Sequence, residues 1–269
     1  MCYEGMHSFV NERLRVFYWG KMDLKQFFEN NPKVALAFSG GVDSAYLLYA
    51  AIKFGAIVTP YYVRSDFQPE FEYEDALRLC RELGTEMKTI RLDVLADPVI
   101  AGNPADRCYY CKKQVFGSII NEAQKDGYKV IIDGTNASDR EDDRPGFRAL
   151  KELEVRSPLR ECGLTKDMIR DLSKEAGLFT WDKPAYACLA TRIRSGEGIT
   201  KEKLEKTEIT EGFLMDLGFR DLRVRQSDNK ARLEINEKDM ELYEKNKGLI
   251  LETLKKYYFS VDPDPEVRK

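Results

Sequence analysis

Strand-like and helix-like segments alternate along the first half of this chain. We expect strands at Lys33–Phe38, Ala56–Val63, Glu86–Leu92 and Tyr128–Asp133. The helices expected between them, with a glycine at or near the end of each, are Ser44–Phe54, Glu70–Leu83 and Tyr109–Lys125. Parallel strands need long connections, usually a helix, whereas antiparallel strands can be joined by short turns. The alternation therefore predicts an α/β fold built on a mostly parallel sheet.

The last third of the chain has a different order of elements. A short strand at Glu154–Arg156 and a helix from the N-cap Thr165 to Ala176 complete the first part. Residues 181–198 contain proline and glycine without a regular period, which is typical of an ordered loop or a linker. Beyond it we expect an α-β-β-α module with a helix at 201–217, strands at 220–226 and 231–235, and a helix at 240–257. The sequence thus predicts two domains, residues 1–197 and 198–269, the second a smaller α+β unit.

The charge balance excludes several classes of partner. The 269 residues include 43 Lys and Arg against 46 Asp and Glu, a net charge of −3, so a dedicated nucleic-acid binder is disfavoured. The longest apolar runs are far shorter than the roughly 20 residues of a membrane-spanning helix. The first twenty residues lack the apolar centre of a secretory signal. We therefore expect a cytoplasmic protein without a membrane partner.

A glycine-rich segment, Ser39-Gly40-Gly41-Val42-Asp43-Ser44, joins the first strand to the first helix. Its glycines let the backbone turn tightly and aim N–H groups inward, and the helix N-terminus adds positive potential, so the loop can hold a pyrophosphate. Ser39 and Ser44 can donate hydroxyl hydrogen bonds, and Asp43 can bind a Mg²⁺ ion that bridges phosphates. The spacing differs from that of the Walker and dinucleotide-binding loops. The alternative is a structural turn in which Ser44 caps the helix.

This loop resembles the signature of the PP-loop ATP pyrophosphatases, over roughly the first 180 residues. The resemblance implies a doubly wound parallel sheet and cleavage of ATP between its α and β phosphates, which yields an adenylated substrate. In such enzymes the ends of the second and fourth strands flank the nucleotide. By analogy, residues 64–66 and the segment with Gly134 and Thr135 lie beside it. The alternative for residues 133–136 is a turn with a helix cap.

Six cysteines in a reducing compartment indicate a metal site, catalysis or burial rather than disulfides. Cys108 and Cys111 have the spacing of metal ligands, and Cys188 lies alone in a later segment. The pair is compatible with a redox couple, half of a zinc site or two ligands of an iron–sulfur cluster. Structural zinc needs a fourth ligand, whereas three thiolates leave one iron of a cluster open. The remaining thiols are Cys2, Cys80 and Cys162.

Together with the loop, these cysteines make the sequence similar to the LarE family of PP-loop sulfur transferases, in its three-cysteine, cluster-bearing branch. The resemblance covers nearly the whole chain. The motifs that carry it are Ser39–Ser44, Arg107–Lys113, Asp133–Arg140 continuing to Asp143–Gly146, Pro184–Arg192 and Arg223–Arg225.

The resemblance implies an enzyme that uses ATP and Mg²⁺ to adenylate the carboxylates of a pyridinium-3,5-dicarboxylate mononucleotide. They become thiocarboxylates for a nickel-pincer cofactor. Family members with one cysteine at the position of Cys188 give up that sulfur themselves. The additional Cys108 and Cys111 imply instead a [4Fe-4S] cluster held by three thiolates and supplied by a sulfide donor. The catalytic residues implied are Cys188 and Asp43.

Two arginines of the second domain are candidate substrate ligands. Arg223 and Arg225 share one face of a strand, where both guanidiniums can clamp a nucleotide phosphate. The alternative is a solvated strand face paired with Glu234 or Asp221. Two further candidates for the substrate site are Arg192 and Glu211. We also expect the small domain to provide the surface of a homo-oligomer.

Three other functions compete with sulfur transfer to a mononucleotide. A tRNA-thiolating enzyme of the same superfamily shares the loop and a three-cysteine cluster, but RNA binding relies on many basic contacts and neither domain has a basic surplus. An ammonia-using amide ligase has no use for three cysteines. A nucleotide-sensing module with structural zinc is the alternative outside catalysis.

Overall fold

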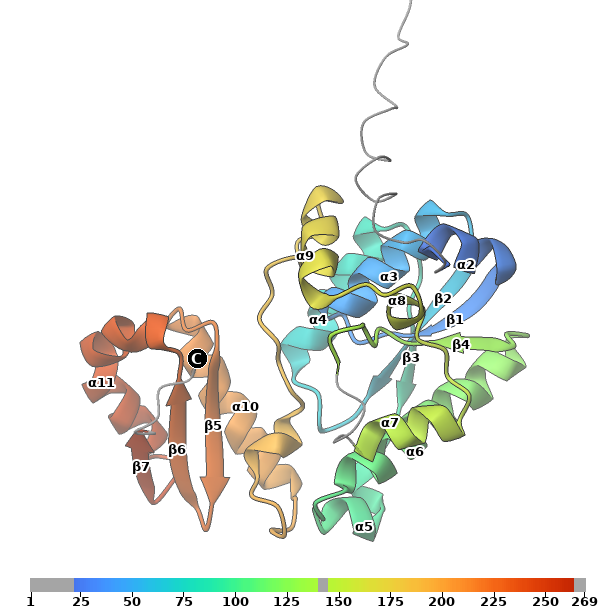
Figure 1. Ribbon diagram of the computed structural model, residues 1–269. Helices are drawn as coiled ribbons and strands as arrows, with labels where there is room; N and C mark the ends of the chain where they lie inside the picture. The colour runs from blue at the N-terminus through green and yellow to red at the C-terminus, as the bar shows by residue number, and fades with distance from the viewer. Residues whose placement is uncertain (1–21, 140–144, 264–269) are drawn as a thin grey trace, which may run out of the picture.

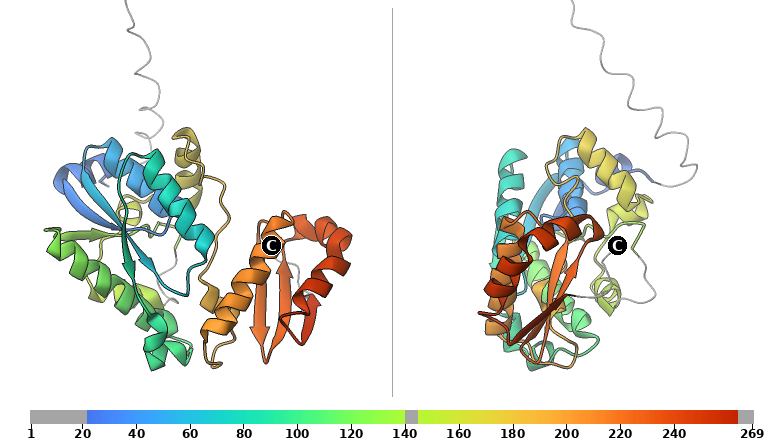
Figure 2. Two further views of the ribbon diagram at one scale, coloured as in Figure 1. Left: turned by 180° about the vertical axis from the view of Figure 1, so that it is seen from behind. Right: turned by 90° about the vertical axis from the view of Figure 1, so that its left-hand side faces the viewer.

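A computed structural model describes residues 22–139 and 145–263. A parallel sheet with helices on both faces forms the larger body, and a small sheet with two helices forms the body beside it (Figures 1 and 2). The elements of the first sheet and its main connections are β1 Lys33–Ala37, α3 Val42–Lys53, β2 Ile57–Arg64, α4 Glu70–Glu82, β3 Lys88–Arg91, α6 Arg107–Lys125 and β4 Val130–Ile132.

The first sheet has the strand order β3-β2-β1-β4, and all its pairs are parallel. The chain moves outward from β1 to β2 and β3, then crosses back to place β4 on the other side of β1. Side chains of a strand alternate between the two faces. Leu36 packs in the cluster with α3 and α4, whereas its neighbour Ala35 packs in the cluster with α6. The sheet is therefore doubly wound, as predicted, with its topological switch point between β1 and β4.

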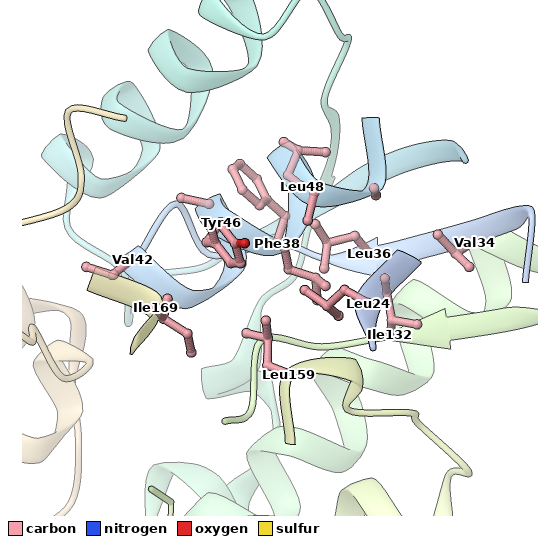
Figure 3. Close-up of a cluster of buried hydrophobic side chains, with 14 of the residues drawn as sticks. Leu24, Val34, Leu36, Phe38, Val42, Tyr46, Leu48, Ile132, Leu159 and Ile169 are labelled. Atoms are coloured by element: carbon pink, nitrogen blue, oxygen red, sulfur yellow. The ribbon is translucent and has the colours of Figure 1, made fainter. Parts of the chain in front are cut away.

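The main core lies between the sheet and the helices on the α3 face. Figure 3 shows Leu36 and Phe38 of the β1 segment beside Leu48 of α3 and Leu159 of α8, Pro158–Glu161. Leu36, Leu48 and Leu159 are fully buried. This core packs β1 against α3 on either side of the glycine-rich loop.

Several shorter elements were missed by the sequence prediction because they are too short to show a period. They are α2 Leu24–Asn30, η1 Val94–Ala96, α5 Pro98–Ala101, α7 Pro145–Glu152, α8 Pro158–Glu161 and η2 Leu189–Arg192. The helix capped by Thr165 is α9, Lys166–Glu175, and the Thr165 hydroxyl accepts a hydrogen bond from the Met168 N–H, as predicted. The predicted fifth strand is reduced to one parallel bridge between Ile132 and Arg156.

The second body contains α10 Lys201–Asp216, β5 Leu222–Ser227, β6 Lys230–Ile235, η3 Glu237–Asp239, α11 Met240–Leu254 and β7 Ser260–Pro263. The hairpin β5–β6 turns at Asp228 and Asn229, both with positive φ, which suits a two-residue turn. The structure confirms the predicted order α-β-β-α and adds a third strand, β7, after the last helix. β7 lacks the alternation of a strand sequence, and it forms because it pairs in parallel with the free edge of β6.

The small sheet has its own apolar core, which includes Val224, Tyr243 and Leu254. The proposed domain limits, 1–197 and 198–269, and the homo-oligomer stay predictions. Among the described residues, no helix has the length and apolarity needed to cross a bilayer.

We expect Leu36→Ala to lower the free energy of unfolding of the larger body by about 2–5 kcal/mol, because it leaves a cavity in a fully buried site. Denaturant unfolding followed by circular dichroism measures the change. Ile57→Ala is the control, since Ile57 lies in the same sheet and is 62% exposed. Equal effects of the two substitutions would contradict this assignment of the core.

Candidate functional site

The glycine-rich loop lies at the carboxyl end of β1, and helix α3 begins within it at Val42. The N-cap is Gly41, and no side chain of the described residues caps this helix. The alternative in which Ser44 caps the helix is therefore wrong, because Ser44 lies inside the first turn. Its hydroxyl instead contacts the Ser39 hydroxyl at 3.1 Å. The uncapped first turn leaves backbone N–H groups available to an anion.

Two glycines allow close approach at the loop. Gly40 has a φ of +72°, and a Cβ atom there would lie 2.9 Å from the Cβ of Ala76 on α4. At Gly134, just beyond β4, a Cβ atom would lie 2.9 Å from the backbone nitrogen of Ser44. The structure thus brings the predicted residues of the fourth strand end against the glycine-rich loop.

The segment after β4 is also held as a turn. The buried Asp133 carboxylate accepts hydrogen bonds from the hydroxyls of Thr135 at 2.5 Å and Ser157 at 2.6 Å. Burial raises the pKa of Asp133, while these hydrogen bonds oppose the rise. The Thr135 hydroxyl is therefore used by Asp133, whereas the Asn136 side-chain amide donates to Asp43 Oδ1 at 3.3 Å. The segment therefore forms a turn held by its own hydrogen bonds, as the alternative expected, and it also contacts the glycine-rich loop. Its place beside the nucleotide stays a prediction.

Asp43 has a cationic partner that sequence analysis missed. Lys166 Nζ of α9 lies 2.7 Å from Asp43 Oδ2. Lys166 is far from the loop in sequence. The sequence pattern predicted only that it lies in the first turn of the helix capped by Thr165. The pairing places a cation directly beside the candidate phosphate site.

A cavity of about 400 Å³ lies over the loop. Its walls include the loop residues Ser39, Gly41, Val42 and Asp43, and also Cys188. Further wall residues that sequence analysis did not select are Tyr62, Glu72, Lys166, Lys183 and Tyr186. One cavity therefore joins the candidate phosphate site to a candidate sulfur site.

Arg107 brings the cysteine segments together. Cys108 and Cys111 lie on one face of the first turns of α6, three residues apart. The neighbouring Arg107 is buried, and its Nη1 donates to the Ala190 carbonyl at 3.0 Å and to Asn103 Oδ1 at 2.6 Å. Since Ala190 follows Cys188 by two residues, this contact holds the Cys188 segment against the start of α6.

The three thiols lie close enough to influence one another. Burial raises the pKa of Cys111 to about 12, and the thiols of Cys188 and Cys108 add to the rise. Burial also raises the pKa of Cys188, with opposition from Arg107 and a further contribution from Cys108. In the part of the chain that the structure describes, no three His, Cys, Asp or Glu side chains form a preformed metal site. Cys80 and Cys162 are buried elsewhere, in the main core.

Arg192 and Glu211 form a buried ion pair. Arg192 Nε and Nη2 each donate to Glu211 at 2.9 Å, and both side chains are almost fully buried. Glu211 also accepts hydrogen bonds from the Val224 N–H at 2.7 Å and the Tyr186 hydroxyl at 2.5 Å. The pair ties η2 to α10 and β5 across the two bodies. The contact of these residues with a substrate stays a prediction.

Arg223 and Arg225 of β5 both reach the loop 181–198, a contact that the sequence did not predict. Arg223 Nη2 donates to the Ala185 carbonyl and Arg225 Nη1 to the Thr191 carbonyl, each at 2.8 Å. Both acidic partners that the alternative expected are present: Arg225 pairs with Glu234, and Arg223 Nη1 lies 3.6 Å from Asp221 Oδ1. The face is not fully solvated, because Arg223 is buried. Their role as a phosphate clamp stays a prediction. Residues of the motifs or thiol set that lie outside the described ranges are Arg140, Asp143, Arg144 and Cys2.

Because Arg192 and Glu211 neutralise each other in a buried site, we expect Arg192→Met to cost about 3–5 kcal/mol of stability by leaving Glu211 uncompensated. The double variant with Glu211→Gln should recover part of that loss. Thermal unfolding of the single and double variants measures the coupling. Additive losses would show that the ion pair does not join the two bodies.

Comparison with known proteins places these features in a family. No family model matches the chain. It is 38% identical over 216 residues to an uncharacterized protein of Synechocystis sp., covering 79% of this chain and 80% of that protein. It is 33% identical over 207 residues to the pyridinium-3,5-bisthiocarboxylic acid mononucleotide synthase of Lactiplantibacillus plantarum, covering 76% and 75%.

A more distant similarity extends to tRNA-specific 2-thiouridylase MnmA of Fervidobacterium nodosum. It has 28% identity over 182 residues and spans about half of each chain, 54% and 52%. The glycine-rich loop at the switch point and the 33% identity to the mononucleotide synthase indicate the same protein family. The chain belongs to the LarE family of ATP-dependent sulfur transferases in the PP-loop superfamily.

Proposed function

We propose that this enzyme adenylates the carboxylates of a pyridinium-3,5-dicarboxylate mononucleotide and converts them to thiocarboxylates for nickel-pincer cofactor synthesis. One observation carries the proposal: the cavity of about 400 Å³ is walled both by the glycine-rich loop and by Cys188. Activation at the phosphates and delivery of sulfur can then take place without release of the activated substrate. The name of the Lactiplantibacillus plantarum relative, at 33% identity, supports this choice of substrate.

Activation is needed because a carboxylate has no adequate leaving group. Adenylation supplies AMP as the leaving group. The N-terminus of α3, which no side chain of the described residues caps, would bind the pyrophosphate part of ATP with its backbone N–H groups. This preorganised positive potential stabilises the charge that develops as the substrate carboxylate attacks the α-phosphorus.

Asp43 is suited to a Mg²⁺ ion because it presents a carboxylate at the cavity wall. When bound, the ion would neutralise phosphate charge. Lys166 Nζ lies 2.7 Å from the same carboxylate. Binding of Mg²⁺ to Asp43 and of ATP phosphate to Lys166 would therefore separate this ion pair. We propose that Lys166 then binds a phosphate oxygen.

We propose Cys108, Cys111 and Cys188 as the ligands of a [4Fe-4S] cluster, since the thiols of α6 and of the 181–198 loop lie near enough to influence one another's pKa. Among the described residues their side chains do not form a ready metal site, so the three thiols would move closer together to hold the cluster. Such a cluster, with one iron free of protein thiolate, would present sulfide for transfer. In this proposal Arg107 holds the two ligand segments together and its charge favours the thiolates.

The mononucleotide phosphate would be bound by Arg223 and Arg225, whose guanidiniums reach the loop that carries Cys188. Transfer of sulfur to tRNA is disfavoured by the net charge of −3, since RNA binding depends on many basic contacts.

We expect the enzyme to exchange labelled pyrophosphate into ATP when the pyridinium dicarboxylate mononucleotide is present and not when tRNA is added instead. Lys166→Met should lower the exchange rate on the order of 100-fold, because it removes a cation from the developing charge. Lys174→Met on the same helix is the matched control, as it lies over the ring of Trp181. Exchange that requires tRNA would overturn the proposed substrate.

We expect protein prepared without oxygen to contain iron and acid-labile sulfide, and each of Cys108→Ser, Cys111→Ser and Cys188→Ser to lose both. Metal and sulfide analysis together with the visible spectrum provides the measurement. Cys80→Ala is the control, since Cys80 lies in the main core and should keep the iron content. Zinc in place of iron in the wild-type protein would reject the cluster.

A further inference from the structure

The carboxylate of Glu72 lies on the cavity wall and takes no part in the proposed binding of ATP, Mg²⁺ or the cluster. Glu72 lies in the first turn of α4, and its side chain lines the cavity together with the glycine-rich loop and Cys188. Among the described residues, no side chain forms a hydrogen bond or an ion pair with the Glu72 carboxylate. The other acidic residue of the wall, Asp43, is paired with Lys166. Glu72 is therefore available to a ligand or a reacting group.

The cations near Glu72 are occupied by other partners. Lys183 pairs with Asp75 at 2.7 Å, and Arg192 pairs with Glu211. Arg223 donates to the Ala185 carbonyl at 2.8 Å. These cations act on Glu72 through space without binding it. The titratable and charged groups that interact electrostatically with Glu72 are Tyr62, Asp75, Lys183, Tyr186, Arg192 and Arg223.

Burial outweighs these cations and raises the pKa of Glu72 to about 7. Both protonation states are then populated near neutral pH, as a group that accepts and returns protons requires. Asp75 also raises the pKa, whereas Lys183, Arg192 and Arg223 lower it.

A second polar group of the same wall also lacks a partner. The hydroxyl of Tyr62 is buried and has no hydrogen-bond partner in the described part of the chain, and burial and Glu72 both keep it protonated by raising its pKa. Unsatisfied buried polar groups are rare in native proteins and call for an explanation. A buried hydroxyl and a partly exposed carboxylate, both on this cavity wall and both without a described partner, indicate a ligand that contacts this side of the cavity.

We infer that Glu72 is the general base of the sulfur-transfer step, which accepts the proton of an S–H group as its sulfur attacks the acyl adenylate. This inference rests on the proposed function, because it uses the activated carboxylate that the glycine-rich loop would produce.

The atoms of the step balance without an oxidant or a reductant. With hydrogen sulfide as the donor, the carbon–sulfur bond forms and the bond between the acyl carbon and the adenylate oxygen breaks. AMP leaves with the electron pair of that bond. One S–H proton moves to the Glu72 carboxylate, and the resulting thiocarboxylic acid loses its remaining proton to water. Glu72 then returns its proton to solvent through the open cavity.

The experiment compares Glu72→Gln with the wild type in two assays, mononucleotide-dependent ATP–pyrophosphate exchange and formation of the thiocarboxylate from hydrogen sulfide. We expect exchange to stay within about twofold and thiocarboxylate formation to fall on the order of 100-fold, the usual contribution of a general base. Glu74→Gln is the matched control, because Glu74 lies on the same helix and is exposed. It should leave both rates unchanged.

Rescue separates a proton acceptor from a structural group. Formate should restore thiocarboxylate formation by Glu72→Ala, because it can occupy the space of the missing carboxylate and accept the proton. An equal fall of both rates in Glu72→Gln, an unchanged transfer rate, or no rescue by formate would overturn the inference. Absence of exchange in the wild type would instead reject the proposed function and the inference with it.

Discussion

Parallel pairing of β1 with both β2 and β4 is the constraint on which the site depends. Parallel strands place all their carboxyl ends at one edge of the sheet. The chain leaves β1 toward one face through α3 and reaches β4 from the other face through α6, so the connections diverge at that edge. A crevice opens there. The glycine-rich loop and Gly134 line its base because they follow the two strands that border the switch point.

Polar contacts over long sequence distances then complete the cavity. Arg107 joins the start of α6 to the segment of Cys188, and the Arg192–Glu211 pair joins that segment to α10 and β5. Burying such charges carries a large desolvation cost, which only well-formed hydrogen bonds offset. The side chains of Arg107, Arg192 and Glu211 have hydrogen-bond partners within the protein. The Glu72 carboxylate and the Tyr62 hydroxyl, both on the cavity, have none among the described residues. The contrast distinguishes side chains that hold the walls from side chains available to a ligand.

Local patterns predicted the regular elements well where those patterns were long. The strands at β1 and β2 and the helices α4 and α9 lie within a few residues of the expected bounds, because periodicity and end signals act locally. β7 was missed because its strand form comes from the free edge of β6. The first turn of α3 was placed too late, since Gly41 caps the helix without a side-chain hydrogen bond that a sequence pattern could reveal.

The sequence by itself determined the α/β class, the glycine-rich loop and the pairing of Cys108 with Cys111 on one turn of a helix, because each depends on residue types at short spacings. Tertiary structure alone decided that Lys166 pairs with Asp43 and that Arg192 is bound to Glu211. It also decided that Glu72 faces the same cavity as Cys188. These pairs are separated by many residues and meet only because the strand order and the crossing helices bring their segments to one edge. Burial and charge at that edge depend on every element around it, which no local pattern encodes.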